Sequence, residues 1–282
     1  MAKVAAYVLG ASGMAKRLVP LMAQGSTVLG DSVTTYADTH YKPEHAKEYD
    51  TAIFWGYVET CQAIMKGFIA EGKAAVYLDL AYWERGTHYK VSVNDRHPTA
   101  YFQDVKHDSV RREMFKVFPK PYQKNERGHI LIAGMSKKAA WAEGREPVES
   151  WELAAIAELK KHTDREIIYR PKPSFAGAKP LEGSKFSDPK TSSLDSLLKG
   201  CYAVVAYHSN VATDGLVEGV PAFVCKGVAK PMALSDLSQI DTPLYPDDRE
   251  QWANNIAYCQ WSEVEMKTGV CWAHLKQEGL IA

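Results

Sequence analysis

The stretch SSLDSLLKGCYAVVAYHSNVATDGLVEGVPAFV, residues 192–224, decides the fold that this chain is predicted to adopt. It starts as an amphipathic run, continues as the apolar run 201–207, turns through polar residues at 208–210, and returns to the apolar run 221–227. Apolar runs that alternate with amphipathic runs are typical of a parallel sheet covered by helices. Such sheets bind ligands beyond the carboxyl ends of their strands. The stretch therefore predicts a strand–helix–strand unit with a ligand site at its polar turn.

The same alternation runs through the whole chain and divides it into two halves. Strands are expected in the first half at 3–10, 27–31, 51–57, 74–83 and 89–93, and in the second half at 129–135, 166–172, 202–208 and 221–227. The alternation fails in FPKPYQKNERG (118–128), which has two prolines and little to bury. We predict an α/β protein with two Rossmann-like, doubly wound domains that face a central cleft. The predicted parts are an N-terminal domain 1–120, a linker 121–127, a C-terminal domain 128–260, and a C-terminal helix within 261–282 that packs back on the first domain.

Composition excludes several classes of function. Lys plus Arg and Asp plus Glu both number 34, and this balance argues against a polyanion binder as a whole while leaving room for a local basic groove. No secretory segment and no run of about 18 apolar residues occurs, so we expect a cytoplasmic protein without a membrane partner. The five cysteines lack CxxC spacing and no DxD-like motif is present, so no metal is predicted.

Polar residues gather where three strands of the second half are expected to end. GMSKK (134–138) is a glycine turn with a hydroxyl and amines, and YRPKP (169–173) places two cations at a strand end. The third strand ends at His208, and the helix after it offers free backbone N–H groups. This combination suits a diphosphate. The predicted donor-binding residues are Gly134, Met135, Ser136, Lys137, Arg170, Lys172, His208, Ser209, Asn210, Thr213, Asp214 and Glu218.

Structural roles for single members of this set stay open: Asn210 as a helix N-cap, Glu218 as a solvated residue, and Arg170 as the partner of a carboxylate. The stretch 192–224 nevertheless resembles the C-terminal half of GT-B glycosyltransferases, which bind a nucleotide sugar through a strand, a polar turn and a helix with a carboxylate before GxP. Here GVP (219–221) matches that closing motif and implies Asp214 as the ribose-binding carboxylate, although the family usually has Glu there and Glu218 is a rival. YRPKP resembles the R-x-H-P strand end of capsule-type members, with a lysine where histidine is common.

The first half offers candidates for the chemistry of sugar transfer. A carboxylate at the end of an apolar strand is unfavourable unless it is used or paired, and Asp79 in YLDLAYWERG (77–86) has that position. Transfer to a hydroxyl benefits from a base, so Asp79 is the first candidate for the catalytic base and His97 the second. The alternative interpretation pairs Asp79 with Arg85. In the GT-B interpretation, the acceptor or sugar is held by Gly10, Ser12, Gly13, Met14, Gly56, Tyr57, Trp83 and Arg85.

The amino-terminal glycine turn supports a competing hypothesis. GASGMAKRL (10–18) imitates a dinucleotide-binding turn, and Asp31 follows at about the distance of a ribose-binding acid. An NAD(P)-dependent oxidoreductase is therefore an alternative function. Lys16 stands where that motif requires its third glycine, which argues against it.

The acceptor is predicted from a basic segment and a second resemblance. Residues 105–129 carry seven Lys or Arg against three Asp or Glu, interleaved with aromatic residues. LDLAYWERG (78–86) and the compact length resemble phage-type glycosyltransferases that modify hydroxymethylated pyrimidines in DNA, which implies base flipping. We predict transfer of a hexose from a UDP-sugar to 5-hydroxymethylpyrimidines in double-stranded DNA; the alternative acceptor is a cell-envelope glycan. The predicted DNA-backbone contacts are Arg111, Arg112, Lys116, Lys120 and Lys124.

Overall fold

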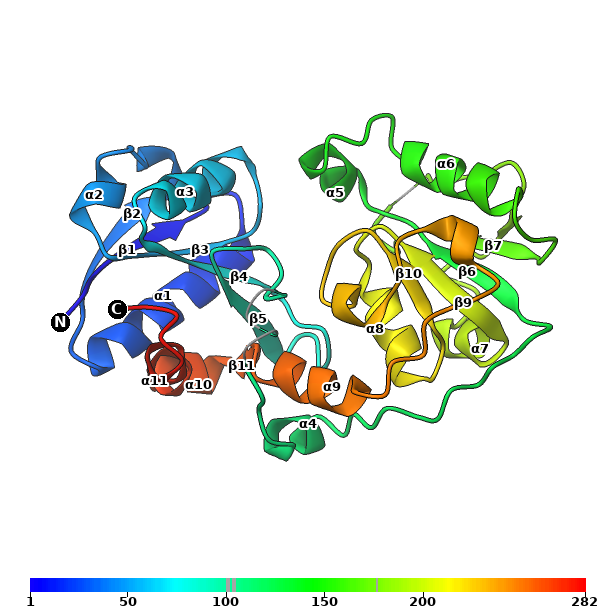
Figure 1. Ribbon diagram of the computed structural model, residues 1–282. Helices are drawn as coiled ribbons and strands as arrows, with labels where there is room; N and C mark the ends of the chain where they lie inside the picture. Colours follow the sequence, from blue (N-terminus) through cyan, green and yellow to red (C-terminus); the bar gives the residue numbers. More distant parts are fainter. Residues whose placement is uncertain (100–101, 103–104, 176) are drawn as a thin grey trace. The chain divides into compact units, whose positions relative to one another are not determined.

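A computed structural model describes residues 1–99, 102, 105–175 and 177–282 (Figure 1). The chain divides into two compact units, the first made of Met1–Pro98 with Ile256–Ala282 and the second of Thr99–Asn255. Residues 256–282 thus belong to the first unit, and the segment 121–127, predicted as the linker, lies inside the second. None of the helices in the described part of the chain is long and apolar enough to cross a membrane.

The first unit is built on a six-stranded sheet in the order β11-β5-β4-β3-β1-β2. Its strands are β1 (Lys3–Val8), β2 (Ser32–Ala37), β3 (Thr51–Trp55), β4 (Ala74–Leu80), β5 (His88–Val93) and β11 (Gln260–Ser262). Its helices are α1 (Gly13–Val28), η1 (Asp38–His40), α2 (His45–Glu48), α3 (Glu59–Ala70), α10 (Glu263–Lys267) and α11 (Val270–Gln277). The strands β1 to β4 are parallel, whereas β5 pairs antiparallel with both β4 and β11. The carboxyl ends of β1 to β4 therefore share one edge.

Helices cover both faces of this sheet (Figure 1). Successive residues of a strand point to opposite faces, so Val4 and Ala6 pack with α1, α10 and α11, while Ala5 and Tyr7 pack with α2 and α3. Gly25 lets α1 and α10 approach closely, because a Cβ there would lie 2.0 Å from the carbonyl oxygen of Met266. The strand predicted at 27–31 is wrong: α1 continues to Val28, and β2 begins only at Ser32.

A buried carboxylate ties the C-terminal helix to the start of the sheet. Asp31 accepts hydrogen bonds from the Trp272 indole at 2.8 Å, the Lys276 ammonium at 2.9 Å and the Ala2 backbone N–H at 2.9 Å. Burial raises the pKa of Asp31, but these donors outweigh burial and hold that pKa below its usual value. Asp31 lies just before β2, at the amino end of the strands, whereas the glycine turn follows their carboxyl end. It therefore cannot act as the ribose acid that the NAD(P) hypothesis requires.

The second unit is built on a parallel five-stranded sheet in the order β10-β9-β6-β7-β8. Its strands are β6 (His129–Ala133), β7 (Ile167–Arg170), β8 (Lys185–Phe186), β9 (Cys201–Ala206) and β10 (Ala222–Val224). Its helices are α4 (Val110–Met114), α5 (Lys137–Ala142), α6 (Ser150–Leu159), α7 (Leu194–Lys199), α8 (Asn210–Val217), η3 (Lys230–Met232), η4 (Leu237–Gln239) and α9 (Arg249–Ala257), which crosses the unit boundary. The predicted strand–helix–strand unit at 192–224 is present as α7, β9, α8 and β10.

The segment predicted as the linker is an extended strap packed against α8. The backbone N–H of Lys120 donates to Val217 at 2.8 Å, and that of Gln123 donates to Gly219 at 2.9 Å. Gly219 leaves no room for a side chain, since a Cβ would lie 2.2 Å from the Pro121 carbonyl oxygen. The strap is thus part of the second unit because its polar backbone is satisfied there.

Candidate functional site

Asp79 lies near the carboxyl end of β4, at the centre of a polar cluster. Its Oδ2 accepts a hydrogen bond from the Tyr77 hydroxyl at 2.5 Å and lies 3.6 Å from the Nζ of Lys90. Its Oδ1 accepts a hydrogen bond from the backbone N–H of Leu80 at 2.8 Å. The side chain of Asp79 is 35% exposed, whereas that of Lys90 is 4% exposed. The carboxylate can therefore meet a ligand, and the ammonium cannot.

The turn after β5 adds two more polar side chains to this cluster. The guanidinium of Arg96 lies 4.5 Å from the centre of the Tyr57 ring, and Nδ1 of His97 lies 3.4 Å from the Tyr82 hydroxyl. The Lys90 ammonium in turn lies 5.7 Å from the centre of the Tyr82 ring. The structure therefore gathers the predicted residues Asp79, His97 and Tyr57 around a lysine.

Sequence reasoning missed three members of this cluster, Tyr77, Lys90 and Arg96, and noted Tyr82 at the strand end without giving it a role. The available signal was a charged residue inside the short apolar strand YKVSV (89–93), since a lysine there must be paired or exposed. The structure pairs it with Asp79. The alternative interpretation that paired Asp79 with Arg85 is wrong, because Nε of Arg85 donates instead to the carbonyl oxygen of Ala81 at 3.1 Å.

The charges of this cluster set the ionisation of Asp79. Burial raises the pKa of Asp79, but the Lys90 ammonium, the Tyr77 and Leu80 hydrogen bonds, and Arg96 outweigh burial and hold it below the usual value. Burial and Arg96 lower the pKa of Lys90, while Asp79 opposes that effect. Asp79 is thus a carboxylate at neutral pH. It can accept a proton or stabilise positive charge on a neighbouring ligand.

The loop that follows β4 is held in place by a side chain of β11. The side-chain oxygen of Gln260 accepts hydrogen bonds from the backbone N–H groups of Tyr82 and Trp83, both at 2.8 Å. Trp83 is buried, and Arg85 is exposed. Gly56, which follows β3, has a φ of 86° and donates its backbone N–H to Leu78 at 3.1 Å, so it shapes the backbone beside the cluster.

The glycine turn of the first unit lies on the same edge of the sheet. Ser12 is the N-cap of α1, and its hydroxyl accepts a hydrogen bond from Ala15 at 3.2 Å. The Gly10 backbone N–H donates to Oδ1 of Asp38 at 3.4 Å, and the Thr60 hydroxyl donates to Oδ2 at 2.8 Å. Asp38 is the acid that follows β2 at this edge, and the sequence prediction missed it. Of the other predicted residues here, Gly13 is exposed and Met14 is half-buried.

In the second unit, the turn at 134–137 ends β6 and starts α5. Ser136 caps α5 by accepting a hydrogen bond from Ala139 at 3.2 Å. Gly134 has no space for a side chain, because a Cβ would lie 2.8 Å from the Tyr169 ring. Lys137 is exposed, and Met135 is buried. The predicted diphosphate turn therefore offers backbone, a hydroxyl and one exposed ammonium.

A carboxyl group that the sequence prediction missed lies beneath this turn. Glu152 is fully buried, and its Oε1 accepts a hydrogen bond from the Met135 backbone N–H at 2.7 Å. Its Oε2 has no hydrogen-bond partner among the described residues. Burial raises the pKa of Glu152, and the neighbouring Glu149 adds to that shift, while the Met135 N–H opposes it. Glu152 therefore supports the turn from inside the unit.

Arg170, predicted to contact the diphosphate, is directed at a loop of its own unit. It is 9% exposed, and its guanidinium donates to Ser187 at 3.1 Å, to the Ser192 hydroxyl at 2.7 Å and to the Ser192 carbonyl at 3.0 Å. Burial lowers the pKa of Arg170, and Asp188 opposes that effect. These contacts hold the loop 187–192 against β7. Lys172, two residues further on, is exposed.

The polar turn at residues 208–210 leads into α8. Ser209 is the N-cap, and its hydroxyl accepts a hydrogen bond from Val211 at 3.3 Å. Asn210 is thus the first residue of the helix and not its cap. His208, Asn210 and Asp214 are partly exposed, whereas Thr213 is 1% exposed and packs inside the unit.

Glu218 and the basic segment pair with other parts of the second unit. Glu218 accepts a hydrogen bond from the Lys120 ammonium at 2.6 Å. Lys124 lies 5.4 Å from the centre of the Tyr245 ring, and Lys116 is exposed.

Two further arginines of the predicted DNA surface lie inside the second unit. Arg111 and Arg112 are 8% and 6% exposed. Arg112 donates to the Asn254 side chain at 2.6 Å and to the Val117 carbonyl at 3.0 Å. A guanidinium buried in this way stabilises the fold and presents little surface to a phosphate backbone.

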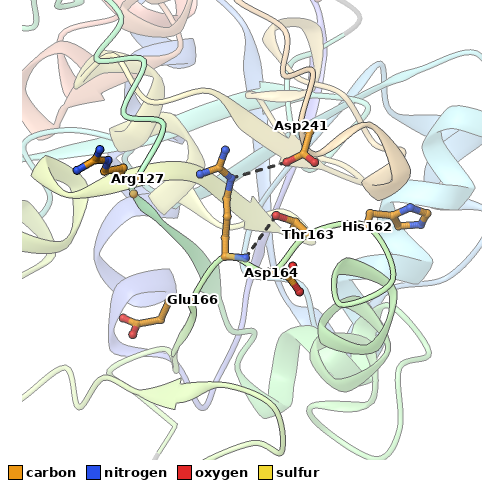
Figure 2. A pocket seen from close by; sticks show the side chains of 8 residues that line it. Arg127, His162, Thr163, Asp164, Glu166 and Asp241 are labelled. Carbon is orange, nitrogen blue, oxygen red and sulfur yellow. Dashed lines mark hydrogen bonds and ion pairs between the residues drawn. The ribbon is translucent and has the colours of Figure 1, made fainter.

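A polar pocket of about 590 Å³ lies on the other edge of the second sheet (Figure 2). It is lined by residues that precede β6 and β7, namely Arg127, Gly128, His162, Thr163, Asp164, Arg165 and Glu166, and by Asp241, which follows η4. Arg165 lies 3.7 Å from Asp241 and 3.7 Å from the centre of the Tyr202 ring. The Arg165 guanidinium thus makes contacts within the second unit. The pocket lies at the opposite edge of the sheet from the predicted donor site.

Comparison with solved structures identifies the fold. The β-Kdo 2,7 transferase of Thermosulfurimonas dismutans KpsC matches 98% of this chain and 100% of its own, at 11% identity and a TM-score of 0.57. The β-Kdo 2,4 transferase of the same protein matches 92% of both chains, at 13% identity and a TM-score of 0.54. No family model matches the chain, and no curated protein matches it by sequence. The predicted fold class, two Rossmann-like domains of the GT-B type, is confirmed.

Proposed function

We propose that this protein is a glycosyltransferase that uses a nucleotide-activated sugar, a UDP-sugar in the first instance. The observation that carries the proposal is the fold shared along more than nine-tenths of the chain with two sugar transferases, together with a partly exposed carboxylate at the carboxyl edge of the first sheet. Fold alone does not define an activity, so the residues at the two strand edges carry the chemical argument.

The donor is assigned to the carboxyl edge of the second sheet. The exposed ammonium of Lys137 and the partly exposed His208 provide cationic or donor groups, and the first turn of α8 provides backbone N–H groups. Ser136 and Ser209 cap the two helices that start there. Asp214 is the proposed ribose-binding carboxylate.

Asp79 is assigned as the base. The acceptor hydroxyl loses its proton to the Asp79 carboxylate as its oxygen bonds to the anomeric carbon of the sugar. The bond from that carbon to the diphosphate oxygen breaks, and the nucleotide leaves with the bonding electron pair. The ionised state of Asp79 at neutral pH suits this role.

A saccharide hydroxyl of a cell-envelope glycan is the acceptor that we favour. The two solved structures described above, which are among those that share the fold, both carry the name of a Kdo transferase. The burial of Arg111 and Arg112 removes two of the five predicted contacts to DNA.

Hydroxymethylated DNA is the second candidate acceptor. The exposed lysines at 116, 120 and 124 favour it, since they follow one another along the segment 116–124. Lys120 forms an ion pair with Glu218. Its ammonium is therefore less available to a phosphate backbone than the sequence alone indicates.

A transfer assay tests both candidates. The protein is incubated with UDP- and CMP-activated sugars and with an envelope oligosaccharide, hydroxymethylcytosine-containing DNA or ordinary DNA, and products are identified by mass spectrometry. A sugar added to the oligosaccharide supports the favoured acceptor, and a sugar added to modified DNA alone supports the second. Absence of transfer with every donor, together with tight binding of NAD(P), would overturn the proposal.

A further inference from the structure

Lys90 is a buried lysine that the proposed reaction does not yet use. The residue is 3% exposed, and its ammonium donates to the Arg96 carbonyl oxygen at 2.8 Å. The same ammonium lies 4.9 Å from the centre of the Tyr77 ring and 5.7 Å from that of Tyr82. A lysine is rarely so buried without a carboxylate nearby, and Asp79 is that carboxylate, at 3.6 Å.

The strand register places these two charges opposite each other. Asp79 of β4 pairs directly with Lys90 of β5 in the antiparallel part of the sheet. Directly opposite residues project from the same face, with Cβ atoms about 5 Å apart. Tyr77, two residues before Asp79, projects from the same face and donates its hydroxyl to the carboxylate. The pairing is therefore built into the sheet and does not depend on a loop.

The surroundings of the pair contain few competing charges among the described residues. Tyr77 and Tyr82 are neutral phenols, since burial raises the pKa of each well above its usual value. The other charged or titratable groups near the pair or these phenols are Arg96, Asp95 and His97, from the turn after β5, and Cys259, before β11. Asp95 accepts a hydrogen bond from the Arg96 backbone N–H at 2.6 Å, which fixes that turn.

We propose that Lys90 is a positioning residue, which holds the Asp79 carboxylate ionised and aimed outward while Asp79 accepts the proton of the acceptor. This inference rests on the proposed function, because it assigns Lys90 a part in the same site. Lys90 cannot touch a substrate, since its own side chain is buried. It acts on the reaction only through the charge and orientation of Asp79.

The proposed action of Lys90 through Asp79 predicts how turnover and its pH dependence change in variants of the two residues. Lys90→Met keeps the aliphatic stem between the two tyrosine rings but removes the charge. The acid limb of its pH–rate profile should move to higher pH, and turnover on that limb should fall about tenfold at a given pH. Lys90→Arg should keep the limb in place. In an Asp79→Asn background, Lys90→Met should lower turnover no further, because the residue through which it acts has lost its charge.

The test measures the ionisation of the Asp79 carboxyl group directly. The carboxyl resonance of Asp79 is followed by NMR during pH titration of the wild-type protein, Lys90→Met and Lys90→Arg. We expect titration below the usual aspartate range in the wild type and Lys90→Arg, and at higher pH in Lys90→Met. Titration in or above the usual range in the wild type would overturn the inference even if neither variant folds.

The two proposals fail in different ways. If the carboxyl titration moves as expected but Asp79→Asn remains fully active, the electrostatic assignment of Lys90 stands and the assignment of Asp79 as base is wrong. If Asp79→Asn is inactive but Lys90→Met leaves the titration of Asp79 unchanged, the base stands and the inference about Lys90 is wrong. A uniform loss of turnover at every pH in Lys90→Met, repeated in the Asp79→Asn background, also overturns it.

Discussion

The carboxyl edges of the two sheets present different chemical groups. At the first edge, the antiparallel strand β5 brings Lys90 opposite Asp79, so side-chain charges converge. At the second edge every strand is parallel, and the edge offers capped helix starts at Ser136 and Ser209. The strongest cation there, Arg170, is turned to the loop 187–192. Under the proposed function, the first edge carries the chemistry, and the second edge binds the donor largely through backbone N–H groups.

The largest expected effect separates chemistry from binding. Asp79→Asn should lower turnover by about 100-fold or more, the range of a lost general base, while donor affinity stays unchanged. Turnover and calorimetric binding of the donor are measured on the same preparation. Glu71→Gln, an exposed acid of the same unit, is the matched control and should behave as wild type. A fully active Asp79→Asn variant would break the assignment of chemistry to the first edge.

Arg170→Ala tests whether Arg170, at the second edge, binds the donor or stabilises the fold. The change removes three hydrogen bonds to Ser187 and Ser192 in a buried setting. The free energy of unfolding should fall by about 2–3 kcal/mol, measured by denaturant titration. The exposed Lys172→Ala is the control for stability. Unchanged stability together with a tenfold loss of donor affinity would instead restore the diphosphate role predicted from the sequence.

Asp31→Asn tests a carboxylate with a purely structural task on the amino edge of the first sheet. Loss of the charge at the Lys276 and Trp272 contacts should destabilise the protein by about 1.5 kcal/mol, measured by thermal or denaturant unfolding. The pKa of Asp31 is lowered in the folded state, so its contribution is present above the unfolded pKa and is lost as pH falls through the folded pKa. Turnover of the folded variant should not change. A selective loss of turnover would place Asp31 in the site after all.

Glu152→Gln should give the smallest effect, about 1 kcal/mol. Burial raises the pKa of Glu152, so the unfolded chain ionises first and the free energy of unfolding falls as pH rises from the usual glutamate range through the folded pKa. The glutamine keeps an oxygen for the Met135 N–H but cannot ionise, so this part of the pH dependence should disappear. Denaturant unfolding of both proteins across acidic and neutral pH checks it. If the free energies of unfolding of the wild type and the variant change in parallel with pH, Glu152 ionises in the folded state at its usual pH.

Much of the fold followed from the sequence because hydrophobic periodicity reports it directly. The stretch 192–224 predicted the elements α7 to β10, since its strands are fully buried and its helices are amphipathic. The strand expected at 27–31 failed because Val28 and Leu29, whose apolar side chains suggested a buried strand, are exposed residues at the end of α1. The short strand β11 was missed because Gln260 and Trp261 continue an amphipathic pattern.

The candidate site was predicted less completely, since it depends on contacts between distant residues. Asp79 was found because a carboxylate at the end of an apolar strand is conspicuous. Its partner Lys90 was missed because strand register, which sequence alone does not state, sets them opposite each other. Arg170 was assigned to a ligand because its serine partners lie about 20 residues further along the chain, in a loop without a recognisable pattern.

Hydrogen–deuterium exchange with and without UDP or CMP tests the two-edge comparison most directly. The account predicts that the nucleotide protects the backbone amides of residues 134–138 and 208–213, at the carboxyl edge of the second sheet, and leaves those of 10–14 unchanged. Protection confined to residues 10–14 and 36–40, at the glycine turn of the first unit, would contradict it.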